Sequence, residues 1–216
     1  MLDGLQSLLA DVYHVDLEHD VRDFLVTDPR FLALSTSDDG RVAGEKLLVR
    51  QDGDDLDLAL FLDDDLLARL AERDPVAALG EENLADFCLA LEGVSHFLYL
   101  AWNALADRSV TLLELELQAE IDKYIAARVL LARQQSVHLG ALFQRLFDGP
   151  VFADNLSPGE LQRYRDATRF AGAYVRSLEA RYDPGHPAPE MTRELRDFWR
   201  LPQPDKLSHI NRAQFA

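Results

Sequence analysis

The sequence predicts an α+β protein that is mainly helical, with a small N-terminal antiparallel β-meander packed on a C-terminal helical bundle. From residue 84 onward, apolar residues recur at spacings of three and four, which is typical of packed helices. Between residues 31 and 62, apolar runs alternate with Asp-Gly pairs, which indicates hairpins. The composition changes near residue 75. We therefore expect a mixed α/β part over residues 1–75 and a helical bundle over residues 76–216, joined as one continuous globular unit.

The N-terminal part is expected to hold a helix, a loop, a meander and a second helix. Leucines at helical spacing predict a helix over residues 2–13, and the charged stretch that follows is expected to be a solvated loop. A cap at Asp63–Asp65 begins a short helix that ends before Pro75. The three strands of the meander are expected in FLALST (31–36), VAGEKLLVRQ (42–51) and LDLALFL (56–62), with turns at SDDG and DGDD.

The central element of the predicted bundle is a helix over residues 84–105, because it is apolar around most of its circumference. A short connection leads to a second helix that ends at residue 133, so the two are expected to be antiparallel neighbours. Thr111 and Glu114 form a capping-box pattern at the start of that helix. Further helices are expected over residues 138–148, from Ser157-Pro158-Gly159-Glu160 to residue 182, and over residues 190–200.

The central helix carries one polar stripe on this apolar background. Glu92, His96, Tyr99 and Asn103 follow one another at spacings of four, three and four, so they share one narrow face. Buried polar groups need partners, so other elements are expected to supply them. The candidate partners are Glu114, Glu120 and Arg128 on the next helix, and Arg165 and Arg169 on a later one.

The stripe has two interpretations, which are a buried structural hydrogen-bond network and a carboxylate–histidine metal site. Glu92 and His96 are four residues apart, and the chain has no Glu-x-x-His of the kind that dinuclear helical bundles use. It also has no G-x-S-x-G elbow, glycine-rich phosphate loop, H-E-x-x-H or C-x-x-C. No catalytic residue can therefore be named from the sequence, and it implies no particular cofactor or metal.

The composition limits the partners. A formal net charge of −16 argues against general nucleic-acid binding and against an anionic membrane surface. The charge is uneven, because residues 157–216 carry ten basic and eight acidic side chains while the rest is strongly acidic. Cys88 is the one cysteine, which leaves no intramolecular disulfide. The N-terminal residues lack a basic segment and a long apolar segment, so we expect a soluble cytoplasmic protein without a membrane partner.

Two functional hypotheses follow. The first is a non-enzymatic interaction, scaffold or assembly protein that binds a protein partner or forms a homo-oligomer; the absence of catalytic motifs favours it. The second is a metal-binding protein or enzyme that uses the polar stripe of the central helix. A solvent-reachable acidic pocket at the stripe favours the second hypothesis, whereas a stripe that is fully buried and saturated with protein hydrogen bonds favours the first.

Overall fold

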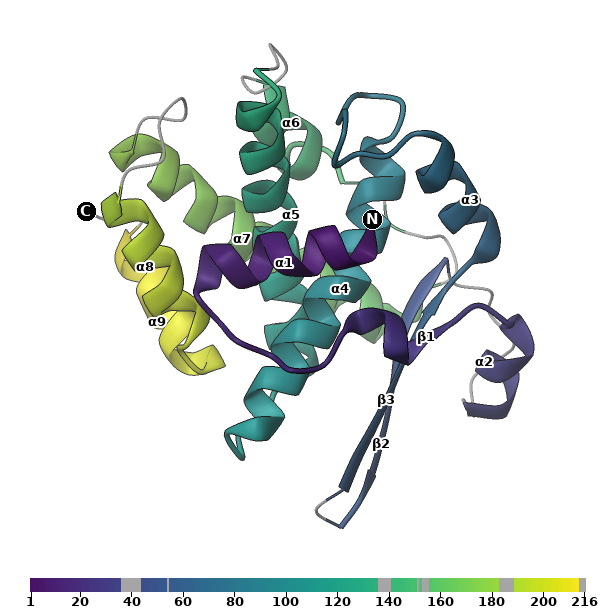
Figure 1. Cartoon of the computed structure of the whole chain (residues 1–216). Helices are drawn as coiled ribbons and strands as arrows, with labels where there is room; N and C mark the ends of the chain where they lie inside the picture. Colours follow the sequence, from purple (N-terminus) through teal and green to yellow (C-terminus); the bar gives the residue numbers. More distant parts are fainter. Residues whose placement is uncertain are drawn as a thin grey trace.

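The fold is built around two long helices. In this computed structural model, α4 (Leu84–Leu105) runs through the middle of the molecule and α5 (Leu112–Arg133) turns back beside it (Figure 1). The N-terminal helix α1 (Leu2–Tyr13) crosses this pair and packs against both helices. The structure describes residues 1–35, 44–53, 55–135, 141–150, 152, 156–182 and 189–213.

The remaining helices surround the central pair. Helix α7 lies along α5, and α8 and α9 cover the end of α1 and α7. The capping box at Ser157 and Glu160 forms at the start of α7 as the sequence predicts. The bounds of these helices are α3 (Asp64–Glu72), α6 (Leu142–Phe147), α7 (Pro158–Arg181), α8 (Pro189–Trp199) and α9 (Gln203–Ala213). The prediction of a mainly helical α+β protein is confirmed.

Helix α4 is the core helix. Its apolar side chains lie in one large cluster with those of the surrounding helices, and Leu91, Val94 and Phe97 are completely buried. Among the described residues it is the one helix that is long and apolar enough to cross a membrane, but most of the qualifying segment is buried inside the protein. A core helix of a soluble protein meets the same criteria, so this feature is weak evidence for a membrane span.

Within the described residues the sheet has three strands and is mixed, so the prediction of an antiparallel meander is wrong in part. Strands β2 (Glu45–Asp52) and β3 (Asp55–Leu62) form the expected antiparallel hairpin. The third strand is β1 (Leu25–Val26), which pairs in parallel with β3 in the order β1-β3-β2. Gly53 takes a φ of +63° in the hairpin turn, a conformation that glycine adopts without strain.

The segment expected to form the first meander strand is helical instead. Helix α2 (Pro29–Ser35) covers it up to Ser35, and the predicted SDDG turn lies outside the described residues. The Asp28 carboxylate accepts a hydrogen bond from the Arg30 backbone N–H at 2.9 Å, and Pro29 takes the first helical position. Both features start a helix, and they outweigh the apolar run that suggested a strand.

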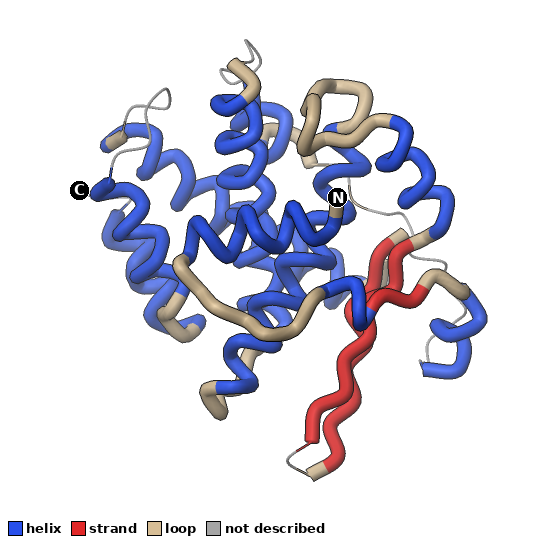
Figure 2. The backbone as a smooth tube through the Cα atoms, in the orientation of Figure 1, coloured by secondary structure: helices blue, strands red, loops and turns tan. Residues whose placement is uncertain are grey.

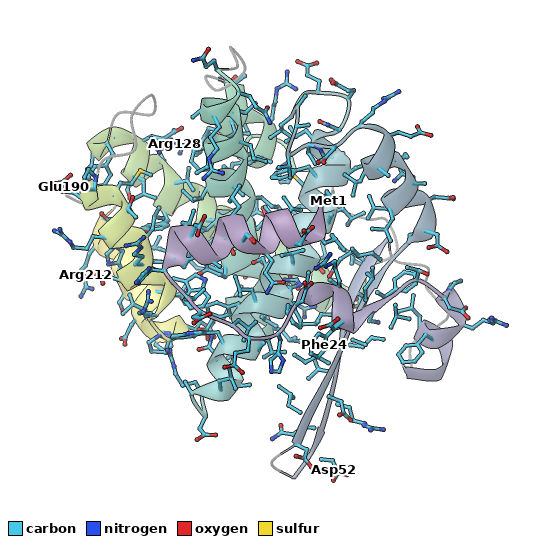
Figure 3. The ribbon with its side chains drawn as sticks, in the orientation of Figure 1. Met1, Phe24, Asp52, Arg128, Glu190 and Arg212 are labelled. Carbon is cyan, nitrogen blue, oxygen red and sulfur yellow. The ribbon has the colours of Figure 1, made fainter. Side chains whose placement is uncertain are left out.

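The hairpin extends from the helical body. Near its base, β2 and β3 contact α4, whereas the far end projects beyond the helices (Figure 2). Asp52 stands at this far end, away from the other labelled residues (Figure 3). The base of β2 therefore brings the start of that strand, including Glu45, against the central helix.

Candidate functional site

A group of largely buried charged side chains lies where the base of the hairpin, α4, α5 and α7 meet. We call it the charged cluster. Each of its side chains interacts with another member, and their exposed fractions run from 8% to 24%. Its members are Glu45 from β2, Glu92 and His96 from α4, Glu116, Glu120 and Lys123 from α5, and Arg163 from α7.

His96 lies between two carboxylates of different elements. Its Nδ1 atom is 3.8 Å from Oε1 of Glu45, and its Nε2 atom is 3.5 Å from Oε2 of Glu116. Glu116 is also 3.6 Å from Nε of Arg163. These separations exceed the usual length of a charge-assisted hydrogen bond, which is about 2.7–2.9 Å. The two carboxylates are therefore close to the imidazole without forming ideal hydrogen bonds to it.

Lys123 forms the tight part of the cluster. Its Nζ atom is 2.6 Å from Oε2 of Glu92 and 2.7 Å from Oε1 of Glu120. The side chains of these three residues are 12–15% exposed, so the cluster approaches solvent on this side. Solvent access is therefore limited, but the cluster is not sealed.

Three buried polar atoms of the cluster lack a hydrogen-bond partner within the described part of the chain. They are Oε1 of Glu45, Nε2 of His96 and Nε of Arg163. Leaving a buried polar group unsatisfied costs about 1–3 kcal/mol, and more for a charged group. Such groups call for an explanation, and an unbound ligand or ion is one of the usual ones.

Burial and the neighbouring charges shift the pKa values of the cluster. Burial raises the pKa of Glu45, and His96 only partly offsets it. Burial by itself would lower the pKa of His96, but Glu116 and Glu45 outweigh it and hold that pKa well above its ordinary value. The pKa of Glu92 is lowered, because the charges of Lys123 and His96 outweigh the effect of burial. The region around His96 therefore retains protons, which is how an excess of buried carboxylates is neutralised.

One glycine allows the strand to approach the central helix. A Cβ atom on Gly93 would lie 2.7 Å from Cδ1 of Leu60 and 3.0 Å from Cγ of Glu45. Real Cβ atoms essentially never approach another atom as closely as the first of these distances. Because Gly93 has no side chain, β2 can bring Glu45 next to His96.

A potential metal site lies within the cluster. Glu45, Glu92 and His96 each offer one ligand atom, and these atoms all lie within 4.8 Å of one another. Two ligands that each lie about 2.0–2.2 Å from a tetrahedral metal are about 3.4 Å apart. The 3.8 Å between Nδ1 of His96 and Oε1 of Glu45 is therefore closer to a ligand–ligand separation than to a hydrogen bond.

A second buried polar group contrasts with the charged cluster. Oδ1 of Asp122 accepts hydrogen bonds from Tyr13 at 2.5 Å and Gln118 at 2.7 Å, and Oδ2 accepts one from Ser95 at 2.6 Å. Lys206 of α9 donates to Oε1 of Gln118 at 2.5 Å. We call these five residues the Asp122 network. Its hydrogen bonds join α1, α4, α5 and α9, so it has the properties of a structural network.

The structure divides the predicted stripe between two environments. Glu92 and His96 belong to the charged cluster. The hydroxyl of Tyr99 instead donates to Oε1 of Glu114 at 2.6 Å, and Nδ2 of Asn103 donates to the Tyr99 carbonyl at 2.8 Å. The second half of the stripe is therefore a hydrogen-bonded structural part, and the first half is the candidate site.

Of the predicted partners, only Glu120 belongs to the charged cluster. Glu114 bonds Tyr99, as described above, and Nη1 of the buried Arg128 contacts Sδ of Met191 at 3.0 Å, away from the stripe. Arg165 is exposed, and the exposed Arg169 pairs with Asp166 at 3.0 Å. The two arginines predicted on α7 therefore face solvent instead of the stripe.

Four cluster residues were not among the predicted partners: Glu45, Glu116, Lys123 and Arg163. Arg163 precedes Ala167 and Ala171 at spacings of four, and both alanines are completely buried. This spacing places Arg163 on the buried face of α7 and could have identified it. Glu45 has no such local signal, because the position of its strand against α4 depends on tertiary packing.

The described surface hollows lie elsewhere. A hollow of about 310 Å³ is formed by α1 and the loop after it, and Asp3, Asp16, Glu18, His19 and Asp20 contribute to its lining. An apolar hollow of about 20 Å³ lies beside Leu79 and Leu142. Neither of these two hollows is lined by a residue of the charged cluster.

Comparison with known proteins adds no functional assignment. No protein-family model matches the chain, and no curated protein or solved structure matches it either. The geometry of the charged cluster is therefore the observation that indicates its chemistry.

Proposed function

We propose that the protein binds a divalent metal ion in its core through Glu45, Glu92 and His96. The observation that carries this proposal is the unsatisfied state of Oε1 of Glu45, which faces Nδ1 of His96 at 3.8 Å without a hydrogen bond. A cation between these two atoms supplies the missing partner. Carboxylate and imidazole ligands together suit Mn²⁺, Fe²⁺ and Zn²⁺.

The net charge of the cluster supports a divalent ion. A histidine that binds a metal is neutral. The four carboxylates of the cluster then face only the two cations Lys123 and Arg163, which leaves two negative charges. A divalent ion neutralises them. Without it, the raised pKa values of Glu45 and His96 provide protons in its place.

The residues that contact the proposed ligands are also consistent with a metal site. Metal-bound histidines usually donate their second ring N–H to a carboxylate, which orients the ring. Nε2 of His96 faces Oε2 of Glu116 at 3.5 Å, and Arg163 lies on the other oxygen of Glu116. A small shift of Glu116 would complete that hydrogen bond and satisfy Nε2.

Three protein ligands leave part of the coordination sphere for water or a substrate, as in catalytic metal sites. The limited exposure on the Glu92 side offers a route for a small molecule. If the protein is an enzyme, we therefore expect a metal-dependent reaction of a small substrate. If it is not, the metal ion is either stored or has a structural role.

The proposal is tested by titrating metal-free protein with Co²⁺ or Mn²⁺ and measuring binding calorimetrically. Wild-type protein is expected to bind, and His96→Gln is expected to lose the high-affinity binding while retaining its far-ultraviolet circular dichroism. His209→Gln is the matched control, because His209 also faces a carboxylate, that of Glu194 at 3.3 Å, but outside the cluster. Equal binding by wild-type protein and His96→Gln would contradict the proposal.

A second candidate function is protein–protein interaction through the β2–β3 hairpin. The hairpin projects beyond the helices, β2 forms an edge of the sheet, and Val49 on that strand is 50% exposed. Sheet edges with exposed apolar residues can pair with another chain. If the hairpin mediates self-association, light scattering will show a concentration-dependent oligomer that Val49→Lys weakens. If the protein is monomeric at all concentrations, self-association is excluded, and the hairpin can then bind only a different protein.

A further inference from the structure

The outer edge of β2 presents backbone groups that can pair with another strand. Within the described residues β2 is the last strand of the sheet, because the strand order is β1-β3-β2. The half of β2 nearer the turn is exposed, and it extends beyond the helices (Figure 1). An exposed strand edge is a template for pairing with a second chain. This half of the hairpin therefore offers an interaction surface for another strand.

The register of the hairpin decides which backbone groups of β2 point outward. Asp52 pairs with Asp55 across the turn, so these two residues exchange backbone hydrogen bonds. Hydrogen-bonded and non-hydrogen-bonded pairs alternate along an antiparallel pair of strands. Val49 therefore belongs to a non-hydrogen-bonded pair, and its N–H and C=O groups point away from β3. The same alternation applies to Leu47 and Gln51.

Two charged side chains near the ends of β2 lie on the same face of the strand and carry opposite charges. Lys46 and Asp52 are separated by an even number of residues, so they share a face. Neither forms an ion pair within the described part of the chain. Arg50, which lies between them on this face, is already paired with Asp57 of β3 at 2.5 Å. Lys46 and Asp52 are therefore free to pair with charges on another strand.

A second copy of β2 complements these charges in one register. If two β2 strands pair antiparallel about a two-fold axis at Val49, Lys46 of each chain lies opposite Asp52 of the other, on the same face. An axis at Leu48, the other register that pairs most of the strand, places Lys46 opposite Arg50 instead. Opposite charges on facing residues are stabilising and like charges are destabilising. The charges therefore favour the register centred on Val49.

We propose that the protein forms a two-fold homodimer in which the β2 strands of two copies pair antiparallel around Val49 and join two three-stranded sheets into one. This inference rests on the second candidate function, interaction through the hairpin, and is independent of metal binding. The two Val49 side chains, each 50% exposed in the single chain, lie beside each other and are covered. Backbone hydrogen bonds supply the affinity, and the contacts between Lys46 and Asp52 fix the register.

The test is an exchange of charges, measured by sedimentation equilibrium of the full chain. Lys46→Asp places like charges opposite each other at both ends of the paired strands, and it is expected to weaken the dimer about tenfold. Asp52→Lys is expected to have the same effect. The double variant Lys46→Asp/Asp52→Lys restores opposite charges and is expected to recover the wild-type affinity. Arg73→Asp is the matched control, because it changes the net charge as Lys46→Asp does, at the exposed end of α3.

A second variant tests the backbone pairing. Val49→Pro removes an N–H group that points away from β3, so the hairpin does not lose a hydrogen bond of its own, and edge strands tolerate proline at such positions. We expect this variant to keep its far-ultraviolet circular dichroism and to be monomeric. Val49→Thr retains the N–H group and the β-branched shape, and it is expected to dimerise. A Val49→Pro protein that dimerises as tightly as the wild-type protein would overturn the inference.

The other outcomes separate this inference from the functions proposed above. Wild-type protein that is monomeric at every concentration would overturn the homodimer, but it would leave metal binding and a different partner for the hairpin intact. A dimer that Lys46→Asp strengthens would also overturn the inference, because aspartate then faces Arg50 in the register centred on Leu48. A dimer that none of the hairpin variants weakens would place the interface elsewhere. Failure of the wild-type protein to bind metal would overturn the metal site and leave the dimer intact.

Discussion

His96 and Glu116 have different roles at the residue scale, and a single substitution distinguishes them. Glu116 orients the imidazole from its Nε2 side and does not belong to the group of three potential ligands. Removing the charge of such an outer partner usually weakens metal binding about 10–100-fold without abolishing it.

Glu116→Gln is therefore expected to bind metal about 10–100-fold more weakly than wild-type protein. His96→Gln is expected to lose the site. Calorimetric titration of both variants checks this order. Binding by Glu116→Gln as tight as in wild-type protein would contradict the assigned role of Glu116.

Lys206 gives a pH-dependent prediction that does not involve the metal site. Burial lowers its pKa to about 7 from an ordinary value of 10.5, although Glu114 and Asp122 oppose the shift and Arg108 adds to it. Between these pH values the unfolded chain binds a proton that the native protein does not. The free energy of unfolding should therefore gain up to about 1.4 kcal/mol per pH unit from Lys206 as the pH rises.

Lys206→Met lacks this contribution, whereas other titrating groups are common to both proteins. The stability of wild-type protein relative to Lys206→Met is thus expected to increase between pH 8 and pH 10, within the window set by the two pKa values. Urea denaturation at several pH values measures it. A constant difference across this range would show that Lys206 retains its proton in the native protein.

The contact between α4 and the hairpin is the decisive feature at the scale of elements. Gly93→Ala would place a Cβ atom 2.7 Å from Cδ1 of Leu60 and 3.1 Å from Oε1 of Glu45. We expect a loss of about 1–3 kcal/mol of stability from overpacking. We also expect weaker metal binding, because Glu45 has to move away from His96.

The matched control is Gly159→Ala near the start of α7, where an added Cβ has no neighbour within 4 Å. Thermal denaturation and metal titration of both variants test the prediction. Gly93→Ala with wild-type metal affinity would show that the position of Glu45 does not matter for the site.

The sequence predicts most of the helices but not how β1 and α2 form. The bounds of α1 and α4 follow from apolar periodicity, and the start of α7 follows from its capping box. The segment after Asp28 shows both an apolar run and a helix start, and the local cap decides between them. Strand β1 has only two residues and exists through its pairing with β3, which no local pattern reveals.

The candidate site could be predicted only in part, for a similar reason. The stripe identifies Glu92 and His96, because helical spacing places polar residues on one buried face. Glu45 enters the site through the packing of a strand, and for Arg163 the helical spacing indicates the buried face of α7 but not which element that face meets. The long-range packing that brings four elements together is not contained in any local pattern.

At the scale of the whole molecule, metal binding is expected to stabilise the fold. The ligands come from a strand and a helix distant in sequence, so the unfolded chain does not present them together. A free metal concentration of about 100 times the dissociation constant then raises the free energy of unfolding by about 2.7 kcal/mol. For a chain of this size this corresponds to a rise of about 5–10 °C in Tm. Differential scanning calorimetry with and without Mn²⁺ measures it, and an equal rise in His96→Gln would point to binding elsewhere.

The most direct test of the central claim is elemental analysis by mass spectrometry of untagged protein purified without chelators, beside the Glu92→Ala/His96→Ala double variant. We expect one manganese, iron or zinc ion per wild-type chain, and none in the double variant at unchanged helical content. Metal-free wild-type protein that also fails to take up added metal would contradict the claim. The charged cluster would then be a structural element, and the hairpin would become the leading candidate for function.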